Sequence, residues 1–61
     1  MAMSKRIMME RYIKERYPKA VFDAFFDTVF GTELQFWTSE KSEDLFSCVM
    51  KDGVMEIIED F

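Results

Sequence analysis

Few side chains in this 61-residue sequence could perform acid–base or covalent chemistry. It contains no histidine, so the commonest general base and the commonest metal ligand are both missing. The single cysteine, Cys48, has no histidine to activate its thiol. A zinc site needs four ligands, which one cysteine without any histidine does not provide. We therefore expect Cys48 to be a small buried hydrophobic residue, and the protein to have no catalytic site, metal site or cofactor.

Three carboxylates, those of Glu40, Glu43 and Asp44, surround an expected turn. Acid–base catalysis by a carboxylate pair needs one member buried with a raised pKa, but these residues lie in polar, loop-like sequence. Their spacing also lacks the D-x-D-x-D-G pattern of a calcium loop. They therefore indicate either a solvated acidic surface or an acidic patch that binds another protein.

The net charge of −4 is divided unevenly along the chain. Residues 1–32 carry six Lys/Arg and four Asp/Glu, whereas residues 33–61 carry two and eight. The acidic half repels phosphates, which makes nucleic-acid binding unlikely although the basic first segment could still touch a phosphate. A partner with a basic groove suits this charge better.

Length and composition predict a single small domain over residues 1–61. Seven Phe, one Trp and six Met supply large side chains for a thin core, so a homodimer or a covering partner is a reasonable expectation. A lone cysteine indicates an intracellular protein, because small secreted domains usually depend on disulfides. Charges interrupt the N-terminal apolar residues, so we expect no signal peptide, no membrane span and a cytoplasmic location.

Two helices are predicted in the basic half. The first covers about residues 4–17, with Ser4 as N-cap and an apolar face that includes Met9 and Ile13. Pro18 should end it and open a second helix over about 18–30, in which valines and phenylalanines recur at helical spacing and Gly31 follows as a C-terminal cap.

The acidic half predicts a three-stranded antiparallel meander, with strands at about 33–38, 45–50 and 54–59. Asp52-Gly53 favours a tight two-residue hairpin turn. The resulting register places Met50 opposite Met55 and Cys48 opposite Ile57, which gives one apolar stripe. The fold class is thus α+β, with a small all-α bundle as the alternative, because Leu45, Phe46, Val49 and Met50 also have helical spacing.

Trp37 has two possible positions in the strand interpretation. If Leu34 and Phe36 pack on the helices, Trp37 lies on the outer face of the sheet and could anchor an interface together with the acidic patch. In the other arrangement Trp37 lies in the core and Phe36 outside. The predicted partner-binding residues are Trp37, Glu40, Glu43 and Asp44.

Absence of catalytic residues, an acidic half and a marginal core together favour a protein–protein interaction module. The expected function is a small acidic effector or inhibitor of a larger protein, similar in type to the accessory proteins that bacteriophages use against host enzymes. Two other functions remain open. One is a nucleic-acid-binding or regulatory module that uses the basic first helix, and the other is a structural subunit of a homo-oligomer.

Overall fold

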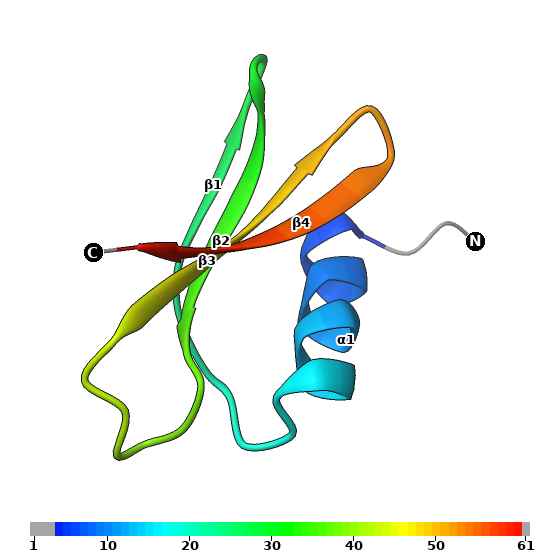
Figure 1. The fold of residues 1–61 in the computed structure, drawn as a ribbon. Coiled ribbons are helices and arrows are strands. Elements are labelled where there is room, and N and C mark those ends of the chain that lie inside the picture. The colour runs from blue at the N-terminus through cyan, green and yellow to red at the C-terminus, as the bar shows by residue number, and fades with distance from the viewer. Residues whose placement is uncertain (1–3, 61) are drawn as a thin grey trace.

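The computed structural model describes residues 4–60, which form one N-terminal helix and a four-stranded antiparallel sheet (Figure 1). The strands follow one another as a meander, in the spatial order β1-β2-β3-β4. The helix packs on one face of the twisted sheet and leaves the other face without a covering layer in the described part of the chain (Figure 1). The α+β prediction is confirmed, and the all-α alternative is wrong.

Helix α1 (Lys5–Arg16) begins where the sequence predicts. Ser4 is its N-cap, and the Ser4 side-chain oxygen accepts a hydrogen bond of 3.2 Å from the backbone N–H of Ile7. Tyr17 caps the other end, and a turn at Pro18 follows. Pro18 therefore ends the first helix as predicted.

The predicted second helix over 18–30 is wrong. This segment instead contains strand β1 (Val21–Thr28), joined to the next strand by a two-residue turn at 29–30. Gly31 is not a helix cap but the first residue of that next strand, with a φ of 142°. The fold therefore has one helix and four strands in place of two helices and three strands.

A bulge in β1 explains the misleading periodicity. Phe22 pairs with Phe36 and Phe25 pairs with Leu34, so the register shifts between Phe22 and Phe25. Residues of a regular strand share a face at even spacing, but a bulge adds one residue and brings positions three apart to the same face. Three-residue spacing is also the spacing of a helix, which is why the pattern predicted a helix here.

The remaining strands agree with the sequence to within two residues at each end. Their bounds are Gly31–Trp37 for β2, Leu45–Lys51 for β3 and Val54–Asp60 for β4. The predicted hairpin register is confirmed, because Met50 pairs with Met55 and Cys48 with Ile57. Asp52 and Gly53 both have positive φ, at 53° and 78°, as a two-residue turn of type I′ requires.

The core lies between α1 and the inner face of the sheet. Helix residues Met9 and Ile13 are fully buried there, and so are Leu34, Phe36 and Cys48 of the central strands. The stripe expected from the hairpin register thus faces the helix. The uncovered outer face carries the residues that alternate with this stripe.

Candidate functional site

The outer face of the sheet holds a row of apolar side chains at the end nearest the β2–β3 loop. Val21 of β1 pairs with Trp37 of β2, and Trp37 pairs with Leu45 of β3. Directly paired residues point to the same side of a sheet, so these three side chains form one surface, here called the Trp37 surface. All three are half-buried. Trp37 therefore lies outside and Phe36 inside, which resolves the two arrangements left open by the sequence.

Trp37 and Glu40 line one shallow hollow. It has a volume of about 300 Å³, and Val21, Ser39 and Ser42 complete its wall. Glu40 is exposed at its rim. An indole with a carboxylate beside it is a combination that suits a protein interface, because Trp supplies buried area and the charge sets orientation.

Glu43 and Asp44 lie in the same loop but do not line this hollow. Both are exposed, and Ser42 shapes the backbone next to them: its Oγ accepts a 3.3 Å hydrogen bond from the N–H of Asp44 and donates one of 3.3 Å to the Asp44 carbonyl. The structure thus joins two of the four predicted partner-binding residues and leaves Glu43 and Asp44 as neighbours along the loop.

A basic hollow adjoins the Trp37 hollow. Three lysines, Lys14, Lys19 and Lys41, line it together with Glu40, and its volume is about 570 Å³. Glu40 therefore stands between an aromatic hollow and a cationic one. Of the three carboxylates predicted for this acidic patch, Glu40 shares a hollow with lysines, and Glu43 and Asp44 line neither hollow.

Most cationic side chains of α1 form ion pairs or cation–π contacts with other residues of the same chain. Lys5 forms an ion pair of 3.4 Å with Asp27, and Arg6 forms one of 2.9 Å with Glu10. Further contacts place cations over aromatic rings, with Arg6 5.6 Å from Phe25, Lys14 5.7 Å from Phe22 and Arg16 3.6 Å from Tyr12. The contacts of Lys5 with Asp27, Arg6 with Phe25 and Lys14 with Phe22 join the helix to β1, whereas those of Arg6 with Glu10 and Arg16 with Tyr12 lie within the helix.

Cys48 is fully buried, as predicted. Burial raises the pKa of its thiol from 9.0 to about 11, against a smaller lowering by the charge of Arg16. The thiolate is the reactive form of cysteine, so this environment makes Cys48 inert at neutral pH. Within residues 4–60, no three His, Cys, Asp or Glu residues are grouped closely enough to hold a metal ion.

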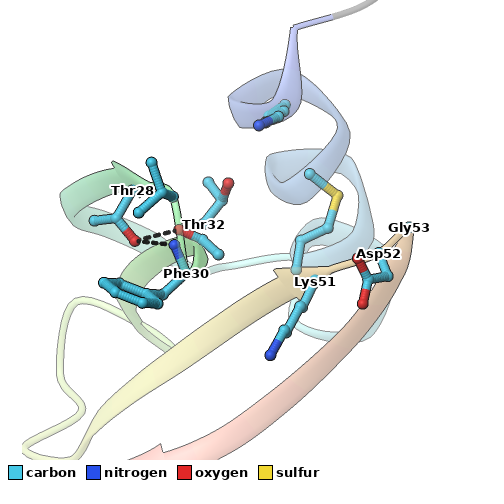
Figure 2. Close-up of a pocket in the computed structure, with 10 residues that line it drawn as sticks. Thr28, Phe30, Thr32, Lys51, Asp52 and Gly53 are labelled. Atoms are coloured by element: carbon cyan, nitrogen blue, oxygen red, sulfur yellow. Dashed lines mark hydrogen bonds between the residues drawn. The ribbon is translucent and has the colours of Figure 1, made fainter.

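A hollow of about 220 Å³ lies between the tips of the β1–β2 and β3–β4 hairpins, and Figure 2 shows the residues that line it. Thr28 shapes its edge: Thr28 Oγ1 accepts a 3.2 Å hydrogen bond from the N–H of Phe30 and donates one of 2.9 Å to the Gly31 carbonyl. Lys51 and Asp52 enter from the other hairpin. Lys5 of α1 also lines the hollow, and its ammonium group is already paired with Asp27 at 3.4 Å.

A further hollow contains residues that the sequence did not single out. It lies on the outer face beside the β1–β2 turn, has a volume of about 330 Å³, and includes Phe26, Phe30, Glu33 and Val49 in its lining. Phe26 and Phe30 belong to the segment that the sequence predicts as the second helix, over about 18–30. Glu33 gave no signal, because its setting depends on cross-strand neighbours that are distant in sequence.

No known protein family, curated protein or solved structure shows significant similarity to this chain. In the described residues, α1 is the one helix, and it is too short and too polar to cross a bilayer. The site must therefore be interpreted from its own geometry.

Proposed function

We propose that this protein is a small protein–protein interaction module that binds a larger protein and modulates it as an effector or inhibitor. The observation that carries the proposal is the Trp37 surface: Trp37 lies between Val21 and Leu45 on a sheet face that no other element of the described chain covers. An apolar surface of this kind on a small domain is typical of a binding site.

The partner is expected to be basic. Carboxylates rather than lysines dominate the outer face, where Glu33 and Glu56 both pair with Val49. Glu43 and Asp44 add negative charge at the loop beside it. Complementary potentials accelerate the encounter of two proteins and fix their orientation, so a basic groove on the partner matches this face.

The same charges disfavour self-association through this face. Two copies packed outer face to outer face would bring their Glu33 and Glu56 side chains together in an apolar interface, and buried like charges are costly. Nucleic-acid binding through α1 is disfavoured for a different reason. Lys5 and Arg6 already form ion pairs with Asp27 and Glu10.

Affinity capture with the tagged full-length chain tests the proposal. The lysate of the source cell is used with and without nuclease, and the bound proteins are identified by mass spectrometry. We expect one stoichiometric partner that survives nuclease. Trp37→Ala should weaken its binding by about tenfold or more, the size expected for a hot-spot residue. Ile7→Ala is the matched control, because Ile7 is an exposed apolar residue on the opposite layer, 45% accessible to solvent.

A charge-reversal variant tests the expectation that the partner is basic. Reversal of Glu40, Glu43 and Asp44 to Lys should slow association with the purified partner and reduce its dependence on salt. Unchanged binding by both the tryptophan and the charge variants would contradict the proposal. Recovery of nucleic acid, or of further copies of this chain alone, would favour one of the other two functions.

A further inference from the structure

The hollow beside the β1–β2 turn combines aromatic walls with one carboxylate. Phe26 of β1 pairs directly with Glu33 of β2, and Glu33 pairs directly with Val49 of β3. Phe30 of the turn completes the apolar wall. Glu33 therefore stands between two apolar neighbours on a sheet face that is otherwise open.

Two neutral donors hold the Glu33 carboxylate in place. Gln35 Nε2 and Ser47 Oγ each donate a hydrogen bond of 3.2 Å to the same oxygen, Oε2. Ser47 is itself buried, with 5% of its surface exposed, so this support is rigid. Among residues 4–60, no lysine or arginine forms an ion pair with Glu33, and no hydrogen bond uses its Oε1. The carboxylate is thus oriented by its neighbours while its charge is left without a partner.

The two phenylalanine side chains that line the hollow are largely exposed to solvent. Phe26 is 50% exposed and Phe30 is 83% exposed, and both lie beside the same carboxylate. A guanidinium group suits such a site better than an ammonium group. It is planar, weakly hydrated and able to stack on an aromatic face while it donates hydrogen bonds to a carboxylate in the same plane.

We propose that this hollow binds an arginine side chain of the partner protein, with Glu33 Oε1 as the acceptor and the rings of Phe26 and Phe30 as the stacking surface. The volume of about 330 Å³ is near the lower end of ligand pockets, which suits one side chain. This inference rests on the proposed function for the source of the arginine. It adds a second contact, on the same face as Trp37 but at the opposite end of β2.

A peptide probe tests the site without the partner. The peptide acetyl-Gly-Arg-Gly-amide is titrated into isotope-labelled full-length protein and followed by NMR. We expect saturable shifts at Phe26, Phe30 and Glu33. The matching citrulline peptide, which has the same shape without the charge, should bind about tenfold more weakly. Equal binding of both peptides, or shifts spread evenly over the acidic residues, would overturn the proposal.

Variants of the protein distinguish binding of the peptide in this hollow from non-specific attraction to its acidic residues. Glu33→Gln should weaken the binding of the arginine peptide by about tenfold. Glu56→Gln is the matched control, because Glu56 pairs with Val49 from the other side, carries the same charge and does not line the hollow. Phe30→Ala removes a highly exposed ring with little risk to folding, and should also weaken binding. Loss of binding with Glu56→Gln but not with Glu33→Gln would contradict the assignment.

Other sources of the cation give different results. Tighter binding of free L-arginine than of the peptide would overturn the assignment to a protein side chain. Self-association that Arg11→Gln abolishes would overturn it in favour of a second copy. A partner captured through Trp37, together with a peptide that does not bind, would reject this inference and leave the proposed function intact. A peptide that binds through Glu33, without any captured partner, would reject the proposed function instead.

Discussion

Phe36 faces Phe46 across strands β2 and β3, with the two ring centroids 5.8 Å apart and the rings tilted by 37°. Tyr17, at the end of the helix, approaches both rings, at 5.8 Å and 5.9 Å. Tilted aromatic contacts at this spacing stabilise a core beyond the area they bury. The three rings join the end of α1 to the two central strands and add to the packing of Met9 and Ile13 on the sheet.

Replacement of Phe36 by Ala should remove a large part of the free energy of unfolding. Phe36 is fully buried, and its truncation is expected to cost about 3–5 kcal/mol. The total stability of a chain this size is about 3–9 kcal/mol. Urea denaturation followed by circular dichroism measures the change. Phe30→Ala is the control and should shift stability by less than about 0.5 kcal/mol, because that ring is exposed. Equal losses in the two variants would contradict this description of the core.

The turn of the β3–β4 hairpin should depend on Gly53 more than on Asp52. Gly53 has a φ of 78°, and a side chain in the left-handed region costs about 1–2 kcal/mol. We expect Gly53→Ala to lower the free energy of unfolding by about that amount. No atom outside its chain neighbours lies within 4 Å of an added Cβ, so the loss would come from the backbone conformation alone.

Asp52→Asn is the matched variant for this turn. Asp52 also has a positive φ, of 53°, but asparagine tolerates that conformation well. The Asp52→Asn variant should therefore have nearly the same stability as the natural chain in thermal unfolding. A larger loss for Asp52→Asn than for Gly53→Ala would show that the side chain of Asp52, not the backbone, stabilises the turn.

The N-cap of α1 gives a third stability prediction. Ser4→Ala removes the acceptor for the N–H of Ile7 and should cost about 1 kcal/mol. Ser4→Asp should retain the stability, because aspartate is also a good N-cap and its charge suits the helix N-terminus. Chemical denaturation of the two variants compares them directly. Equal destabilisation by alanine and aspartate would indicate that the serine hydroxyl has another role.

The sequence predicted the β3–β4 hairpin well because local chemistry determines it. The dipeptide Asp52-Gly53 specifies the turn, and the turn fixes a register that can be checked against the apolar pattern. β1 could not be predicted in the same way. Its bulge between Phe22 and Phe25 depends on pairing with β2, and without that pairing the spacing is that of an amphipathic helix.

The candidate site was predictable only in part. The outward position of Trp37 follows from simple alternation once Leu34 and Phe36 are placed inside. Glu33 could not be identified, because Gln35 is close in sequence but the second donor and the paired apolar residues come from the neighbouring strands. Ser47, one of those donors, lies fourteen residues away in the sequence.

The stability of the fold should fall at alkaline pH through Cys48. In the unfolded chain its thiol ionises near the ordinary pKa of 9.0, and in the folded protein burial raises that pKa to about 11. Between these values the unfolded state binds fewer protons than the folded state, so stability decreases as pH rises. The contribution is complete below pH 9 and is lost progressively up to about pH 11. The loss between pH 8 and pH 10 is about 1 kcal/mol.

Comparison with Cys48→Ala isolates this contribution from that of other groups. All other titratable groups are present in both proteins, so their contributions cancel in the difference. Urea midpoints measured from pH 7 to pH 10 should converge as pH rises, because only the natural chain loses the thiol contribution. In parallel, a thiol reagent should modify native Cys48 only as fast as the protein unfolds, since the side chain is fully buried. Parallel pH curves, or rapid modification of the folded protein, would show that the thiol is accessible to water.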